Sequence, residues 1–194
     1  MKNGGFLYYF MIYKNNNSLN NTVDIVPMVT IFIEKEDKIL MLKRAPTKKI
    51  APNKWAGIGG HIEKEEYKTP MKACLRELEE ETGLIVNDLI YINLKYLIIR
   101  NVKDEILREQ YVYFGKTDKN PLFYEFSEGK LEWIDKSKVM TLEMPMTCEY
   151  ILKHYFESEI SKRLEVGVAI YFNGKENILW NEMLDFDNYK GKIV

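Results

Sequence analysis

Four glutamates fall within five positions of this chain, at residues 77 and 79–81, directly after Arg76. On a helix the side chains of Glu77, Glu80 and Glu81 share one face, because residues three and four apart are neighbours there. Two such charges at ~4 Å repel by up to about 4 kcal/mol at an effective dielectric near ~20. A proton or a hard cation relieves this repulsion, and carboxylate oxygens favour Mg²⁺, with Mn²⁺ as the alternative, over Zn²⁺.

A plainer alternative is a solvated acidic face, on which Arg76 forms ion pairs with Glu79 or Glu80. The surrounding residues favour a metal site instead, since a glycine pair precedes the acidic stretch and a single glycine ends it. Mg²⁺ usually takes one or two carboxylates and shares its other positions with substrate phosphates. The expected ligand is therefore phosphorylated.

The acidic stretch is predicted to lie on a helix over residues 70–82. Pro70 suits the first turn, Thr69 suits the N-cap, and Gly83 suits the position after the last turn. An apolar stripe at i, i+3, i+4 and i+7 is expected to face the core. It consists of Met71, Cys74, Leu75 and Leu78. The acids then point away from the core on a different face.

Together these residues resemble the Nudix box, the signature of hydrolases that cleave nucleoside diphosphates linked to another group. The signature reads glycine, five residues, glutamate, seven residues, Arg-Glu, an aliphatic residue, any residue, Glu-Glu, any residue, glycine and an aliphatic residue. The positions that fit are Gly60, Glu66, Arg76, Glu77, Leu78, Glu80, Glu81, Gly83 and Leu84.

One spacing departs from that signature. Nine residues, 67–75, separate Glu66 from Arg76 where the family has seven. The extra length belongs to the loop before the helix, because the helical half of the box is intact. An alternative register therefore places Lys68 where the family has its first glutamate.

The resemblance covers roughly residues 25–180. Residues 42–44 and 53–60 are similar to the strand and turn that lead into the box in MutT-type enzymes. Residues 128–134 resemble the later segment of that domain, where a further metal-binding or base glutamate lies. A helix and hairpin over about 146–180 resemble the 8-oxo-dGTP diphosphatase branch in order and spacing.

The resemblance implies an α/β fold, a Nudix-like α/β/α sandwich with a mixed β-sheet between helices. It implies Glu80 or Glu128 as the base of a hydrolysis, and Arg76 as the residue that orients the carboxylates. The metal ligands that it implies are Glu77, Glu80, Glu81 and a backbone carbonyl near Gly60.

Substrate-binding residues are expected around the box. The glycine pair 59–60 would approach the ligand, and Lys43 would contact its phosphates, with a solvated loop as the alternative. Trp133 is the first aromatic candidate to stack on a base, with Tyr8 and Phe32 as further candidates and core packing as the alternative for each.

Two features depart from the oxidised-guanine branch. The asparagine that the branch carries after the tryptophan of the strand is Ala56 in this chain. The acidic side chains that precede its C-terminal helix have only Glu143 or Glu149 as substitutes here. Both departures concern the base and leave the hydrolysis of the phosphate chain untouched.

The leading interpretation is Mg²⁺-dependent hydrolysis of a nucleoside triphosphate, with 8-oxo-dGTP as a candidate, to a nucleoside monophosphate and pyrophosphate. A second interpretation is hydrolysis of another nucleoside diphosphate derivative, such as ADP-ribose or a dinucleoside polyphosphate. A third is a nucleotide-sensing domain without turnover. The third predicts a damaged acidic set, whereas the set here is complete.

Length and composition set further limits. The 194 residues suffice for one domain, predicted over residues 23–194, with residues 1–22 as an N-terminal appendage. A net charge of −1 does not favour a polynucleotide partner, and no apolar stretch approaches the ~18 residues of a membrane span. Cys74 and Cys148 lack metal-ligand spacing, which indicates a reducing cytoplasm. The oligomeric state stays open.

The remaining pattern predicts strands interleaved with two helices, hence a mixed sheet between helices. Asn173 and Gly174 are typical of a hairpin turn. The second helix is expected to begin near Thr147. The predicted strands are residues 26–34, 38–43, 89–101, 108–116, 131–134, 166–172 and 176–180, with 55–62 extended.

Overall fold

A computed structural model gives the structure of the chain and describes residues 23–103, 106–158, 163–172 and 174–183. The predicted appendage 1–22 and Asn173 lie outside the described residues. No helix in the described ranges has the length and apolar composition needed to cross a membrane.

Within these residues the strands form one nine-stranded sheet. The strands are β1 (Asp24–Lys35), β2 (Lys38–Arg44), β3 (Trp55–Ala56), β4 (Leu89–Lys103), β5 (Ile106–Thr117), β6 (Glu125–Phe126), β7 (Gly129–Asp135), β8 (Glu165–Phe172) and β9 (Lys175–Glu182). Their order is β6-β7-β2-β1-β5-β4-β8-β9, with β3 paired to β2. β1 pairs with β5 and β4 pairs with β8 in parallel, and the other pairs are antiparallel, so the predicted mixed sheet is confirmed.

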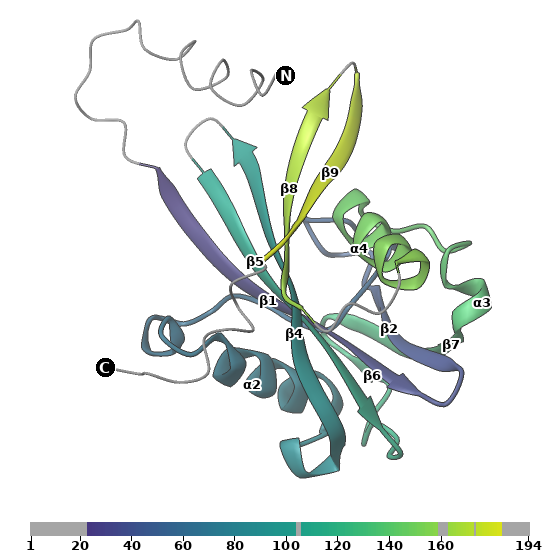
Figure 1. Ribbon diagram of the computed structural model, residues 1–194. Coiled ribbons are helices and arrows are strands. Elements are labelled where there is room, and N and C mark those ends of the chain that lie inside the picture. The colour runs from purple at the N-terminus through teal and green to yellow at the C-terminus, as the bar shows by residue number, and fades with distance from the viewer. Residues whose placement is uncertain (1–22, 104–105, 159–162, 173, 184–194) are drawn as a thin grey trace, which may run out of the picture.

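Helices cover both faces of the sheet, as Figure 1 shows. On one face lies α2 (Pro70–Thr82), and on the other lie α3 (Lys136–Val139) and α4 (Met146–Glu157). Alternate residues of β1 pack against the helices on opposite faces of the sheet, since successive strand side chains point to opposite faces. Ile31 packs in one cluster with Leu78 of α2, and Phe32 packs in the other with Ile151 of α4. The predicted α/β/α sandwich is confirmed.

The helix α2 begins and ends where the sequence predicts. Gly83 has φ +72° and closes the helix in the left-handed conformation, and Pro70 occupies the first turn. Thr69 is the N-cap but forms no side-chain cap bond. Cys74 and Leu78 are buried as predicted, whereas Glu81 and Thr82 are also buried. The core-facing side is therefore wider than its apolar stripe and includes an acid.

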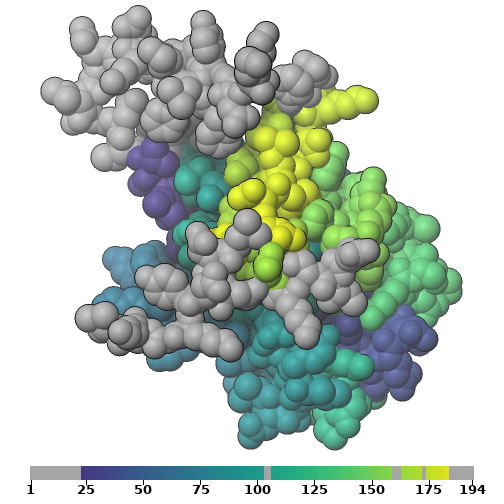
Figure 2. Space-filling model, viewed as in Figure 1, coloured from purple at the N-terminus to yellow at the C-terminus, as the bar shows by residue number. Residues whose placement is uncertain are grey.

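The predicted hairpin is confirmed as the antiparallel pair β8–β9, and Gly174 has φ +75° in its turn. It extends the sheet beyond β4 and lies at the surface beside α4, in yellow and green in Figure 2. Trp180 of β9 stacks on His154 of α4, with ring centroids 4.1 Å apart.

The stretch 55–62 runs alongside β2 and β1, as its predicted extended conformation requires. It contains β3, and residues 58 and 61 form single bridges to Ile31 and Met28 of β1. Four short elements were not predicted, because they are too short to show a periodic pattern: β6, α3 and the 3-10 helices η1 (Lys64–Glu66) and η2 (Val86–Asp88).

Candidate active site

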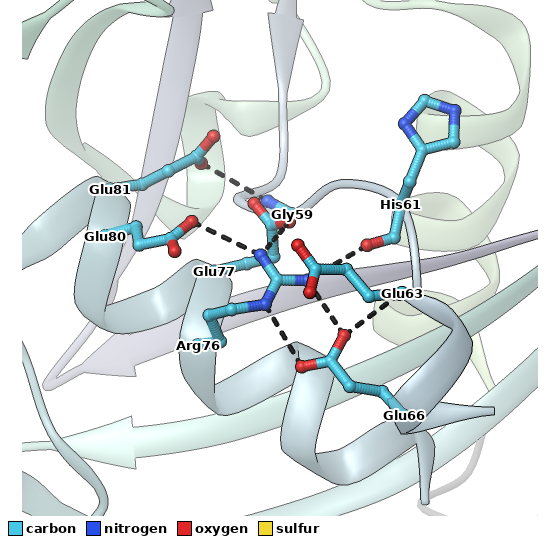
Figure 3. A network of polar contacts seen from close by, with 8 residues as sticks. All are labelled: Gly59, His61, Glu63, Glu66, Arg76, Glu77, Glu80 and Glu81. Atoms are coloured by element: carbon cyan, nitrogen blue, oxygen red, sulfur yellow. Dashed lines mark hydrogen bonds and ion pairs between the residues drawn. The ribbon is translucent and has the colours of Figure 1, made fainter. Parts of the chain in front are cut away.

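The side chain of Arg76, on α2, is surrounded by oxygen acceptors (Figure 3). Its Nε and Nη2 donate to the two carboxylate oxygens of Glu66, each at 3.0 Å. Its Nη1 donates to Glu77 at 2.7 Å and to Glu80 at 3.2 Å. Nη2 also donates to the carbonyl of His61 at 3.0 Å. Arg76 thus ties the acidic helix to the loop that precedes it.

These contacts decide between the two registers for the first glutamate of the box. Glu66 lies in η1 and accepts both bonds from Arg76, whereas Lys68 is exposed. The hydrogen bond from Arg76 lowers the pKa of Glu66 below its ordinary value. The three residues 67–69 lead from η1 into α2, so the longer spacing leaves the bond between Glu66 and Arg76 intact.

Glu81 is the most deeply placed acid of the cluster, with 7% of its surface exposed. It accepts a hydrogen bond from the Gly59 N–H at 3.3 Å. Burial raises its pKa to about 8, although that bond opposes the rise, and the charges of Glu77 and Glu128 add to it. Burial also raises the pKa of Glu77, more than the bond from Arg76 lowers it. Both carboxyl groups therefore hold a proton more readily than a free glutamate does.

The glycine pair passes between β1 and α2 with no room for side chains. Gly59 has φ +145°, and a Cβ there would lie 2.2 Å from the carbonyl oxygen of Val29. A Cβ on Gly60 would lie 2.5 Å from Oε1 of Glu77. The Gly60 carbonyl, predicted as a metal ligand, accepts a bond from the Val29 N–H at 2.9 Å. Its further role as a ligand stays a prediction.

A cavity of about 690 Å³ collects most of the predicted site residues. Its acidic wall comes from α2 and from the turn before β7. The predicted residues that line it are Gly59, Gly60, Arg76, Glu77, Glu80, Glu81 and Glu128. Glu128 is paired with Lys48, and its backbone carbonyl accepts a bond from the Ala45 N–H at 2.8 Å.

Two predicted substrate-binding residues lie outside this cavity. Lys43 is exposed, and its Nζ lies 5.6 Å from the ring centroid of Trp55. The next residue, Arg44, lines the cavity instead, because successive strand side chains alternate. Trp133 pairs with Leu40 of β2 and lies beside Lys35, whose Nζ is 5.9 Å from its ring. Both placements correct the sequence interpretation.

Among the described residues, none of the others considered for recognition of the base has an exposed side chain in the cavity. Phe32 lines the cavity but is fully buried and packs at 5.1 Å on Phe114. Tyr8 lies outside the described residues. Glu143 and Glu149 are both exposed and do not line the cavity. Neither acid therefore replaces the acidic side chains of the oxidised-guanine branch.

The wall of the cavity formed by the sheet and α4 was missed by the sequence analysis. It includes the polar residues Arg100, Arg108 and Gln110, and the available signal was the apolar run 97–99 that ends at Arg100. Thr147 and Cys148 of α4 complete it. Burial raises the pKa of the Cys148 thiol to about 12, so it is protonated and unreactive at neutral pH.

The acidic wall suits a hard cation in its chemistry, since carboxylate oxygens and a raised pKa are present together. In the conformation seen, Glu77 and Glu80 bind Arg76, and Glu81 binds the Gly59 N–H. Among the described residues no three His, Cys, Asp or Glu side chains are gathered around one point. A cation that used Glu80 would need Glu80 to turn from Arg76.

Comparison with known proteins agrees with this geometry. The family model of the NUDIX domain matches residues 25–154, more than half of the chain. The chain is 33% identical over 81 residues to dihydroneopterin triphosphate diphosphatase of Haemophilus influenzae, a match that covers 42% of each protein. It is 42% identical over 57 residues to m7GpppN-mRNA hydrolase NUDT17 of Homo sapiens, 29% of this chain and 17% of that protein. These matches span less than half of either curated relative.

Solved structures share the fold. A MutT protein from Bacillus halodurans superposes with a TM-score of 0.63 at 23% identity, over 81% of this chain and 97% of that one. The NUDIX domain of Shewanella oneidensis NrtR, complexed with ADP ribose, superposes with a TM-score of 0.59 at 14% identity, over 79% and 98%. The box geometry, the sandwich and the family model agree, and the chain belongs to the Nudix family.

Proposed function

We propose that this chain is a Mg²⁺-dependent pyrophosphohydrolase that converts a nucleoside triphosphate into a nucleoside monophosphate and pyrophosphate. The observation that carries the proposal is the meeting of Glu77, Glu80, Glu81 and Glu128 on one cavity wall, with Arg76 fixed among the first two. Four acids around one cavity repel a phosphate chain, so they suit this substrate only together with a cation.

Mg²⁺ held by Glu77, Glu80 and Glu81 would neutralise the phosphates and lower the pKa of water. Glu77 and Glu81 suit this role because burial favours their neutral form and a cation reverses that preference. The side chain of Glu80 is 59% exposed, so it turns from Arg76 at little cost in packing.

In the reaction a water molecule attacks a phosphorus in line with the bridging oxygen that leaves. A new P–O bond forms, the anhydride P–O bond breaks, and a carboxylate takes the proton of the water. Glu80 and Glu128 are the two candidates for this base. In the conformation seen, each forms an ion pair with a cationic side chain, Arg76 and Lys48 respectively, and must leave it before it can accept the proton.

Arg76 acts as a positioning residue. Its five donors are shared between the acids and the His61 carbonyl, and the double bond to Glu66 fixes the plane of the guanidinium. Glu77 is thereby held against Gly60, with its carboxylate on the cavity wall.

The cavity has Ala56 where the oxidised-guanine branch has asparagine. The acids Glu143 and Glu149 are exposed and do not line the cavity, so they form no acidic pair there. Dihydroneopterin triphosphate and ADP-ribose belong among the compounds to test, because similar proteins are named for them. The complete acidic set favours turnover over a sensing role.

The test is a turnover screen with Mg²⁺, Mn²⁺ and EDTA against nucleoside triphosphates, 8-oxo-dGTP, dihydroneopterin triphosphate, ADP-ribose and capped RNA. We expect pyrophosphate release that needs a divalent cation. Release of AMP and ribose 5-phosphate from ADP-ribose alone would support the second interpretation. Absence of turnover with every compound would contradict the proposal and favour a sensing domain.

A further inference from the structure

The sheet wall of the cavity carries two arginines that face each other. Arg100 of β4 and Arg108 of β5 are direct partners in the antiparallel ladder, and both line the cavity. Like charges directly opposite on neighbouring strands are destabilising. Burial and the charge of Arg100 together lower the pKa of Arg108. The pair is therefore costly to the folded chain unless an anion meets it.

Neither arginine has a carboxylate partner in the described part of the chain. Arg100 donates from Nη1 to Oγ1 of Thr147 at 3.0 Å. Nε of Arg108 is buried and has no hydrogen-bond partner among the described residues. Arg76, on the acidic wall, binds three carboxylates. The two walls of the cavity therefore suit different ligands. The acidic wall suits a cation, and the wall with Arg100 and Arg108 suits an anion.

Two polar, uncharged side chains, Gln110 and Thr147, accompany the arginine pair. Gln110 lies two residues after Arg108 on β5, so it shares the same sheet face, and it donates to Thr30 at 2.7 Å. Thr147 lies in the first turn of α4, the positive end of the helix dipole. All of these residues line the cavity, and none offers a compensating negative charge.

We propose that Arg100 and Arg108 form a second anion subsite, which binds a phosphate monoester on the part of the substrate that is not hydrolysed. Two guanidinium groups suit a tetrahedral dianion, because each can donate two parallel hydrogen bonds to it. The inference rests on the proposed function and narrows its substrate class to nucleotides that carry a phosphate in addition to the cleaved chain.

The first test compares hydrolysis of two matched pairs of triphosphates, ATP with its 2′-phosphate derivative and ATP with its 3′-phosphate derivative. We expect kcat/KM to favour the phosphorylated member at least about tenfold. Arg100→Gln and Arg108→Gln should each remove this preference, whereas Lys138→Gln on α3 should keep it. Equal kcat/KM for both members, or a preference that survives both substitutions, would overturn the subsite.

The second test separates the subsite from catalysis. Binding of adenosine 2′,5′-bisphosphate, 3′,5′-bisphosphate and 5′-monophosphate is measured by calorimetry in EDTA, where no turnover occurs. We expect at least one bisphosphate to bind about tenfold more tightly than the monophosphate, and the gain to vanish in both variants. Equal affinities overturn the subsite, whereas a tenfold gain without turnover in any screen overturns only the proposed hydrolysis.

Two controls guard against loss of folding. Lys138→Gln removes one exposed positive charge from α3 and should leave the bisphosphate preference unchanged. Arg100→Lys keeps the positive charge but lacks the planar guanidinium with its paired donors. It should therefore retain part of the preference that Arg100→Gln loses. A purely structural role predicts a lower Tm for both glutamine variants. The subsite predicts an equal or higher Tm, since each variant removes a like-charge contact.

Discussion

Arg76 and Glu66 form a two-bond pair, with Nε and Nη2 each 3.0 Å from a different carboxylate oxygen. Two parallel bonds fix both the position and the plane of the guanidinium. The same guanidinium reaches Glu77 and Glu80, so the geometry of the acidic wall depends on a residue in the preceding loop.

The first prediction removes this anchor with Glu66→Gln. Loss of the charge-assisted bonds should lower the free energy of unfolding by about 1–3 kcal/mol and reduce kcat about tenfold or more. The control is Glu65→Gln, an exposed neighbour in the same 3-10 helix. Chemical denaturation and steady-state kinetics measure both. Equal behaviour of the two variants would show that the pair has no positioning role.

The second prediction concerns Gly60, whose added Cβ would lie 2.5 Å from Glu77 Oε1. Gly60→Ala should push the Glu77 carboxylate from its place and lower kcat at least about tenfold. Glu77→Asp retracts the carboxylate, so the double variant should be less impaired than the sum of the single variants. Strict additivity in this double-mutant cycle would mean that the two residues act independently.

The helix α2 was predictable because its signals are local. Pro70 and Gly83 mark its two ends, and the spacing of the acids within it needs no tertiary information. The loop before it was harder, since only the bonds from Arg76 to Glu66 distinguish the two registers.

The other wall of the cavity depends on contacts between distant segments. Arg100 and Arg108 meet through the register of β4 and β5, which sequence pattern does not specify. Lys43 was chosen in place of Arg44 for a related reason. Most of β2 is buried on both faces, so its apolar run shows no alternation from which to tell which side chain faces the cavity.

A third prediction follows from the pKa of Glu81, which burial raises from an ordinary value of 4.5 to about 8. The native state then binds a proton that the unfolded state has lost between these values. The free energy of unfolding of the metal-free protein should therefore fall as pH rises from about 4.5 to 8, by on the order of a few kcal/mol.

Glu81→Gln should remove this contribution, while Glu79→Gln, an exposed change on the same helix, should keep it. Thermal unfolding in EDTA at several pH values measures the effect. Mg²⁺ affinity should rise over the same window, because the proton must leave before the ion binds. Parallel pH profiles for the wild type and Glu81→Gln would refute the assignment.

The fourth prediction separates the two candidate bases. Removal of the base should lower kcat about 10²-fold or more at saturating Mg²⁺. Glu80→Gln and Glu128→Gln are compared, with Glu149→Gln as an exposed control outside the cavity. One of the first two should show this loss, and the other should lose less activity. A loss of less than about tenfold in both would exclude both as bases.

The last prediction tests Arg44 against its neighbour Lys43. Arg44 lines the cavity and donates from Nε to the Ile50 carbonyl at 3.0 Å, and its charge lowers the pKa of Glu81. No carboxylate in the described residues forms an ion pair with it, so its charge is available to the phosphate chain. Lys43 is exposed over Trp55 and does not line the cavity.

Arg44→Gln should therefore raise KM for a triphosphate about tenfold or more, since charge-assisted bonds to phosphate contribute about 1.5–3 kcal/mol each. Lys43→Gln removes the same charge one residue away and should change KM less than about twofold. Tm serves as the folding control for both variants. A larger effect at Lys43 would mean that the phosphates approach from the opposite face of β2, and the position of the substrate would have to be revised.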